Sequence, residues 1–281
     1  MSDPRKISNT VLMTGVPRSG TTLCCTLLNE SSDCLALHEP IPPEQFVQVN
    51  DRSRACKIVS EAANQARKNV LNTGYVVSKH MSGSLPENPV ETSSSELRRE
   101  IVSLGDLKIS KALSDEFTLV IKHNALFAAL LSELTDEYTV FAIVRNPAAV
   151  FASWQTVDFP VNRGRIPMGE LYDFNLSREL DREQDRVVRQ FTIIGWFFEQ
   201  FRRYLSPHFV LTYERIVDTD GAALSRIAPN INPEKALNEK SQSLDEGKSE
   251  SFEQLVIKNR DLFLPWYSAS EVIDKARSLV N

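Results

Sequence analysis

A glycine-containing turn near the start of the chain holds the residues best suited to chemistry. Gly15 and Gly20 have the spacing of the phosphate-binding loop G-x-x-x-x-G-K-[ST], whose backbone N–H groups converge on phosphate oxygens at a helix N-terminus. Thr21 stands where that loop carries its lysine, and the cation lies earlier, at Arg18. Such a loop suits a nucleotide 5′-phosphate, with the guanidinium reaching the group beyond that phosphate. The hydroxyls available to the same phosphate are those of Ser19, Thr21 and Thr22.

Two polar residues follow the next apolar run of the chain. Residues 34–37 read as a short buried strand, and His38 and Glu39 come directly after them. Ligand-facing groups of an open parallel sheet lie just beyond the carboxyl ends of its strands, so we expect both beside the phosphate loop. Glu39 is then a candidate general base, and the alternative is a solvated turn residue before Pro40. For His38 a structural hydrogen-bonding role is the simpler interpretation.

A further strand, predicted at 117–121, ends in a lysine and a histidine, Lys122 and His123. This places one cation and one titratable imidazole at the ligand-binding edge of the sheet. Lys122 would support negative charge on a bridging oxygen. His123 fits three roles equally well: a base, a group that orients an acceptor, or a helix cap. The pattern is not unique, because Lys79 and His80 likewise follow an apolar triplet.

An arginine and a serine form a second candidate anion site. Residues 138–144 predict a strand, which Arg145 leaves for a helix with Pro147 in its first turn. Ser153 lies eight residues after Arg145, about two helical turns on, on a face that can return towards it. A guanidinium with a hydroxyl partner is a fitting receptor for a second, separate phosphate. The alternative is a surface arginine and a buried helical serine.

Hydrophobic periodicity predicts the elements that must position these residues. Further helices are expected at 51–72, 125–134 and 147–154, with one or two more within 171–205. Further strands are expected at 75–77 and 209–212. Residues 82–95 read as a loop that is either mobile or a lid over an acceptor site, and 239–251 as a flexible polar segment.

Composition bounds the class of protein. With 281 residues, 42% of them hydrophobic, we expect residues 1–281 to form one α/β domain, a phosphate-loop-type central parallel sheet flanked by helices. The net charge of -5 argues against a nucleic-acid partner. Cys24, Cys25, Cys34 and Cys56 have no C-x-x-C spacing, which indicates thiols in a reducing, cytoplasmic compartment. We expect neither a secretory nor a membrane-spanning segment.

Taken together, these motifs resemble the PAPS-dependent sulfotransferases, where PAPS is 3′-phosphoadenosine 5′-phosphosulfate. The resemblance rests on PRSGTT between a strand and a helix, on a later R-N-P with a serine eight residues after its arginine, and on a glutamate 21 residues after the loop arginine. The spelling GVPRSGTTL is most similar to the tyrosylprotein and related bacterial branch. Many relatives carry aspartate where Asn146 stands, which we interpret as a difference in helix capping.

The resemblance implies a nucleotide site made from two motifs. The residues that would bind the 5′-phosphosulfate are Pro17, Arg18, Ser19, Gly20, Thr21 and Thr22. Arg145 and Ser153 would bind the 3′-phosphate, and Tyr213 matches a tyrosine that approaches the nucleotide. Ser249, Ser251 and Lys258 resemble the late segment that folds over PAPS in the tyrosylprotein branch.

The resemblance also implies catalytic roles. Glu39 matches the glutamate that deprotonates the acceptor hydroxyl, Lys122 a lysine that stabilises the transferring group, and Arg18 would contact the bridging and sulfuryl oxygens. His123 lies near the histidine base of the cytosolic branch, so the chain has two candidate bases, of which we favour Glu39.

The expected reaction moves the sulfuryl group of PAPS to a hydroxyl of a small-molecule or carrier-bound acceptor, giving PAP without a metal. Three alternatives are a nucleotide-dependent small-molecule kinase, a non-catalytic PAP-binding domain, and a sulfotransferase domain of a larger synthase. A kinase should carry a lysine next to Gly20 and depend on magnesium. The sequence has no signature that identifies the acceptor or the oligomeric state.

Overall fold

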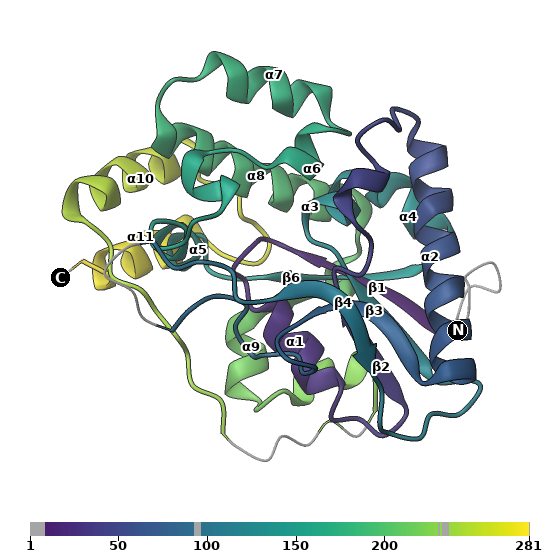
Figure 1. Cartoon of the computed structure of the whole chain (residues 1–281). Coiled ribbons are helices and arrows are strands. Elements are labelled where there is room, and N and C mark those ends of the chain that lie inside the picture. Colours follow the sequence, from purple (N-terminus) through teal and green to yellow (C-terminus); the bar gives the residue numbers. More distant parts are fainter. Residues whose placement is uncertain (1–8, 93–96, 230, 232–235, 281) are drawn as a thin grey trace.

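The computed structural model describes residues 9–92, 97–229, 231 and 236–280. Its centre is a five-stranded parallel sheet in the order β2-β5-β1-β6-β7 (Figure 1). The strands are β1 (Thr10–Gly15), β2 (Cys34–His38), β5 (Thr118–Lys122), β6 (Thr139–Val144) and β7 (Val210–Thr212). The predicted α/β class with a central parallel sheet flanked by helices is confirmed. That the chain forms one domain stays a prediction.

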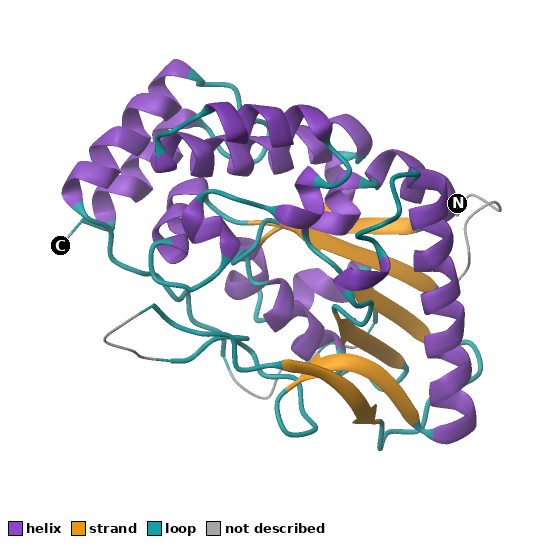
Figure 2. Ribbon diagram, turned by 45° about the horizontal axis from the view of Figure 1, so that its top comes forward, coloured by secondary structure: helices purple, strands orange, loops and turns teal. Residues whose placement is uncertain are grey.

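The strands are nearly continuous apolar runs because helices cover both faces of the sheet (Figure 2). Successive side chains point to opposite faces, and along β5 Leu119 and Ile121 belong to one hydrophobic cluster while Val120 belongs to the other. The cluster around Leu119 is packed by side chains of α2 (Arg52–Thr73), α3 (Ala125–Ala129), α4 (Leu131–Glu137), α5 (Pro147–Trp154) and α8 (Arg186–Tyr204). The cluster around Val120 is packed by α1 (Thr21–Leu28) and α9 (Tyr213–Asp218).

The remaining helices are α6 (Pro167–Glu170), α7 (Phe174–Arg182), α10 (Glu246–Lys258) and α11 (Ala269–Ser278). Of the one or two helices expected within 171–205, the structure has two, α7 and α8. All four cysteines are buried and free. Among the described residues, no helix combines the length and the apolar character that a membrane crossing requires.

The helix predicted at 125–134 is in fact two helices, separated at Leu130. The Arg52 guanidinium donates a hydrogen bond of 2.6 Å to the Ala129 carbonyl, while the Glu133 N–H donates to the Leu130 carbonyl. Because the arginine takes over a carbonyl that the helical ladder would use, the α-helical hydrogen-bond pattern is interrupted there.

Two further boundaries differ from the prediction. Residues 246–251, predicted as part of a flexible segment, are the start of α10, whose N-terminus is capped by the Asp245 carboxylate accepting the Lys248 N–H. Phe209 precedes β7 in a short 3-10 helix, so that strand begins one residue later than predicted.

A separate antiparallel pair lies beside the large sheet. It consists of β3 (Tyr75–His80) and β4 (Ser103–Lys108), of which only the start of β3 was predicted. Ser78 of β3 is fully buried, and its hydroxyl oxygen accepts the backbone N–H of His38 at 3.0 Å. This bond holds β3 against the carboxyl end of β2.

Replacing Ser78 by alanine should lower the free energy of unfolding by about 1–3 kcal/mol, because the buried His38 N–H loses its acceptor. Urea unfolding measures the change. Ser84→Ala is the matched control, since it removes an exposed hydroxyl that donates to the Met81 carbonyl. Equal losses in the two variants would show that the Ser78 bond does not hold the two sheets together.

Candidate active site

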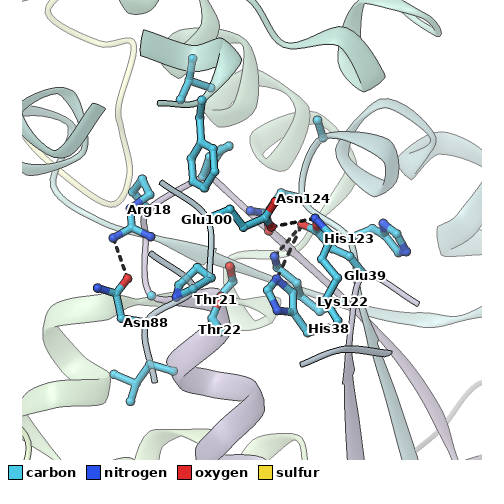
Figure 3. A pocket seen from close by; sticks show the side chains of 18 of the residues that line it. Arg18, Thr21, Thr22, His38, Glu39, Asn88, Glu100, Lys122, His123 and Asn124 are labelled. Carbon is cyan, nitrogen blue, oxygen red and sulfur yellow. Dashed lines mark hydrogen bonds and ion pairs between the residues drawn. The ribbon is translucent and has the colours of Figure 1, made fainter. Parts of the chain in front are cut away.

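A cavity of about 710 Å³ lies where the five strands of the large sheet end. Each strand contributes a residue at or just past its carboxyl end, and these residues are Arg18, Glu39, Lys122, Arg145 and Tyr213. Arg18 lies on one side of the cavity, and Glu39 and Lys122 lie on the other (Figure 3). The parallel sheet therefore brings together chemical groups that are far apart in the sequence.

The phosphate-loop residues border this cavity at the start of α1. Gly20 precedes the helix in a left-handed conformation (φ 87°), and no side chain caps the helix N-terminus. A Cβ at Gly20 would lie 2.5 Å from Cδ2 of Tyr213, so only glycine fits there. Pro17, Thr21 and Thr22 also line the cavity. The uncapped N–H groups and the helix dipole make this end of α1 attractive to an anion.

Arg18 carries the cation of this loop into the cavity from a left-handed backbone conformation (φ 74°). Its Nη2 donates to Asn88 Oδ1 at 2.9 Å and its Nε to Ser153 Oγ at 3.3 Å. Burial, followed by the positive charges of Arg98 and Arg145, lowers the pKa of Arg18 to about 10. Arg98 and Arg145 therefore repel the Arg18 guanidinium at this end of the cavity, and an anion bound beside Arg18 would relieve the repulsion.

Ser19 differs from the prediction. It is fully buried and is absent from the cavity lining, and its hydroxyl donates to the Ile143 carbonyl at 2.8 Å. Its backbone N–H donates to the Val16 carbonyl at 3.0 Å. Ser19 thus secures the loop to the end of β6 instead of presenting a hydroxyl to a ligand.

Arg145 is buried at the second anion position. Its guanidinium lies over the Tyr213 ring, 4.4 Å from the centroid, and its Nη2 donates to the Lys240 carbonyl. Its Nε is buried without a hydrogen-bond partner in the described structure. Ser153 lines the same cavity, but its hydroxyl accepts from Arg18. The predicted pair is therefore brought to one cavity without a direct hydrogen bond between its members.

The backbone around Arg145 is held by a helix cap and a half-buried glutamate. The Asn146 side chain accepts the Ala148 N–H and so caps α5, as interpreted from the sequence. Glu214 Oε1 accepts the Asn146 N–H at 2.9 Å, and Glu214 Oε2 accepts the Tyr267 hydroxyl at 2.5 Å. These bonds fix the turn from which the Arg145 side chain enters the cavity.

Glu39 and Lys122 form a pair held by two bonds. The Glu39 backbone N–H donates to the Lys122 carbonyl at 2.9 Å, and the Lys122 Nζ lies 2.8 Å from Glu39 Oε1. Glu39 has a left-handed backbone (φ 46°) that turns its carboxylate over β5. Burial alone would raise the pKa of this carboxyl, but the charges around it, Lys122 foremost, hold the pKa well below its ordinary value. Glu39 is therefore an ionised carboxylate at neutral pH.

The two histidines beside Glu39 are neutral. Burial is the main cause that lowers the pKa of His38 to about 2 and that of His123 to about 3. The Nε2 of His123 accepts the backbone N–H of Ile41 at 3.2 Å. This bond occupies the nitrogen lone pair that a base would need and leaves the ring proton on Nδ1.

Several cavity residues were not predicted as site residues. For Lys79 the sequence held a signal, because Lys79 and His80 follow an apolar triplet as Lys122 and His123 follow a strand. In the structure, the Lys79 Nζ lies 3.0 Å from Glu39 Oε2. No sequence signal marked Arg98, Glu100 or Asn88, because these residues reach the cavity from loops before β4. Late in the chain, the lining residues are Ala236, Leu237, Asn238, Lys240 and Gln242, so Ser249, Ser251 and Lys258 on α10 are not part of it.

An apolar wall adjoins the Glu39 side of the cavity. It is made of Ile41, Phe46, Leu126, Val161, Ile166 and Met168. Ile41 follows Glu39 by two residues and its N–H is bonded to His123, while α3, which carries Leu126, packs against α6, which carries Met168. The described residues contain no group of three or more His, Cys, Asp or Glu side chains placed to hold a metal ion.

No known protein family and no curated protein sequence matches the chain. Two similar solved structures are sulfotransferases. The sulfotransferase from Alicyclobacillus acidocaldarius is 11% identical, with a TM-score of 0.46 over 96% of this chain and 99% of that chain. The sulfotransferase domain from the Synechococcus PCC 7002 olefin synthase is 13% identical, with a TM-score of 0.37 over 99% of this chain and 97% of that chain. Sequence identities and TM-scores this low carry no argument about function. The function is therefore inferred from the geometry of the site.

The neutral state of His123 predicts how stability depends on pH. A histidine with its pKa lowered from 6.5 to about 3 binds fewer protons in the folded than in the unfolded protein. The contribution of the neutral His123 to the free energy of unfolding is therefore fully present above about pH 6.5 and is lost as the pH falls towards 3. Replacing it by glutamine, which still offers an acceptor to Ile41, should make the slope of unfolding free energy between pH 4 and 6 shallower by about 1.4 kcal/mol per pH unit.

Chemical unfolding of the wild type and the His123→Gln variant at several pH values measures this slope. Identical slopes would mean that His123 is protonated in the folded protein, which would contradict its role as a neutral acceptor.

Proposed function

We propose that this protein is a PAPS-dependent sulfotransferase that moves a sulfuryl group to the hydroxyl of an apolar acceptor. The observation that carries the proposal is the meeting of two sets of groups in one cavity. The guanidiniums of Arg18, Arg98 and Arg145 line the cavity, and an ionised carboxylate paired with a lysine lies across from Arg18. The first set suits a nucleotide with two separate anionic groups, and the second suits transfer to a hydroxyl.

The residues present fit such a nucleotide. Arg18 and the uncapped start of α1 offer donors to the 5′-phosphosulfate. Arg145 has a buried Nε without a partner, and a 3′-phosphate is the kind of acceptor that would satisfy it. The Tyr213 ring lies between these two positions, beside both Gly20 and Arg145. PAPS itself would supply an activated sulfuryl group on an oxygen of its 5′-phosphate.

Transfer needs a base at the acceptor and positive charge at the donor oxygens. Glu39 takes the proton of the acceptor hydroxyl as the acceptor O–S bond forms and the S–O bond to the 5′-phosphate breaks. Lys122 and Arg18 hold the negative charge that collects on the leaving phosphate oxygen and the sulfuryl oxygens. We assign the base to Glu39 and not to His123, because the His123 Nε2 is already an acceptor for Ile41.

The apolar wall indicates the character of the acceptor. Its side chains adjoin Glu39, and the neighbouring His38 and His123 are uncharged. Apolar surface favours an acceptor whose hydroxyl is carried on an apolar body. This fits a free small molecule and a carrier-bound chain equally.

Glu39→Gln should lower turnover by about 10²- to 10⁴-fold, because glutamine keeps the shape of the side chain but cannot take a proton. Affinity for PAP should stay nearly unchanged. Turnover with a panel of phenols and aliphatic alcohols, together with PAP calorimetry, measures both. Glu61→Gln on the exposed face of α2 is the control variant. A collapse of PAP affinity in Glu39→Gln would contradict the assigned role.

Arg145→Ala should weaken binding of PAP by about 10- to 100-fold, the loss expected for a charge-assisted hydrogen bond to phosphate. Binding of adenosine 5′-phosphosulfate, which has no 3′-phosphate, should change little. Isothermal titration calorimetry measures both ligands. Equal losses would count against a 3′-phosphate site at Arg145.

The same calorimetry on the unmodified protein separates the rival functions. A sulfotransferase or a PAP-binding domain should bind PAP more tightly than AMP or ATP without magnesium. A kinase should prefer ATP with magnesium. Tight PAP binding without turnover on any acceptor would leave the non-catalytic domain as the function.

A further inference from the structure

Four side chains of alternating charge run through the Glu39 side of the cavity. Glu100 Oε1 lies 2.9 Å from Lys79 Nζ, which lies 3.0 Å from Glu39 Oε2. Glu39 Oε1 in turn lies 2.8 Å from Lys122 Nζ. Each carboxylate oxygen of Glu39 thus has a lysine of its own. The proposed transfer assigns a role to Lys122 but none to Lys79.

Lys79 reaches Glu39 because of where the small antiparallel sheet lies. Ser78, the residue before it, is bonded to the backbone N–H of His38 and holds β3 at the end of β2. Glu100 comes from the segment before β4, where it forms an isolated bridge with Val90. Both side chains line the cavity, and Figure 3 shows Glu100 reaching towards the charged cluster around Glu39.

The two lysines differ in what they are free to do. Lys122 is almost fully buried under Glu39, and the proposed transfer uses its charge at the leaving oxygen. Lys79 bonds a second carboxylate, Glu100, and stays on the acceptor side. Although burial lowers it, the two carboxylates raise the pKa of Lys79 above its ordinary value. Lys79 therefore keeps its charge whatever Lys122 contacts.

Without Lys79, Lys122 alone would have to keep the Glu39 carboxylate ionised. A carboxylate that loses its only cation in a buried site takes up a proton and can no longer serve as a base. The titratable and charged groups that face Glu39 are His38 on β2, Lys122 and His123 at the end of β5, and Lys79 on β3 with Glu100 behind it. Because the two histidines are neutral, Lys79 is the cation that remains.

Resting on the proposed function, we propose that Lys79, oriented by Glu100, is a positioning residue: it keeps the Glu39 carboxylate ionised and aimed at the acceptor independently of Lys122. A purely structural salt bridge that pins β3 to the sheet is the competing explanation. This competing explanation predicts that Lys79→Met lowers the free energy of unfolding without changing the ionisation of Glu39.

The first test needs no substrate. The pKa of Glu39 is followed by ¹³C NMR of its side-chain carboxyl, assigned by comparison with Glu39→Gln. Lys79→Met should raise that pKa by about 1–3 units, the effect of losing an adjacent opposite charge. Lys122→Met alone should leave Glu39 ionised at pH 7, and the double variant should raise its pKa above the value of either single variant. An unchanged Glu39 pKa in Lys79→Met overturns the proposal.

The second test follows turnover against pH. Lys79→Met should shift the acid limb of kcat upwards by about 1–3 pH units with little change in the KM for PAPS, and Lys79→Arg should restore it. Glu100→Gln should lower kcat without moving the acid limb of the kcat–pH profile to higher pH, because Lys79 keeps its charge but loses its orienting partner. Lys108→Met, on the exposed side of the same small sheet, is the matched control. A rise in KM alone, or a lost kcat with an unmoved acid limb, overturns the proposal.

The two tests also separate this inference from the proposed function. If the wild type transfers nothing from PAPS, the proposed function fails, and the NMR titration still decides whether Lys79 controls Glu39. Circular dichroism and melting confirm that each variant is folded. If Lys79→Met does not fold, Lys79→Gln, which also removes the charge, carries the same comparisons.

Discussion

The five parallel strands all end at one edge of the sheet, and this constraint decides where Arg18, Glu39, Lys122 and Arg145 lie. The end of β1 carries Arg18, β2 is followed by Glu39, β5 ends in Lys122, and β6 is followed by Arg145. Because the strand order is β2-β5-β1-β6-β7, the carboxylate and its lysine are neighbours, and the arginines lie on the far side of β1. The order of strands thus divides the cavity into the half around Glu39, which is the proposed acceptor half, and the half around the arginines, which is the proposed donor half.

The two halves balance their charges differently. In the acceptor half, Glu39 is matched by Lys122 and Lys79, and Lys79 by Glu100, so the charges cancel among protein groups. In the donor half, Arg98 and Arg145 repel Arg18, Glu239 lies 3.7 Å from Arg145, and Arg145 Nε has no hydrogen-bond partner in the described structure. A buried site with surplus positive charge gains most from an anionic ligand, whereas a neutral, apolar half accepts an uncharged one. This asymmetry supports the proposed separation of a nucleotide donor from a hydroxyl acceptor.

Backbone conformation at two residues makes this arrangement possible. Arg18 and Glu39 both adopt positive φ angles, which cost a non-glycine residue on the order of 1–3 kcal/mol each. At Glu39 the turn directs the carboxylate back over Lys122, and at Arg18 it directs the guanidinium towards Asn88 and Ser153. Such strain persists only where the surrounding structure holds it, here through the Glu39 N–H bond to β5 and the burial of Ser19.

The sequence alone determined the strands of the large sheet and placed Arg18, Glu39, Lys122 and Arg145 at their ends, because buried strands and phosphate loops are local patterns. It did not determine the break at Leu130 or the direction of the Ser19 hydroxyl, which depend on Arg52 and Ile143 from distant parts of the chain. Only the tertiary structure brought Lys79 and Glu100 to the cavity. They belong to a small antiparallel sheet, and where such a sheet packs is decided by long-range contacts such as the bond between His38 and Ser78.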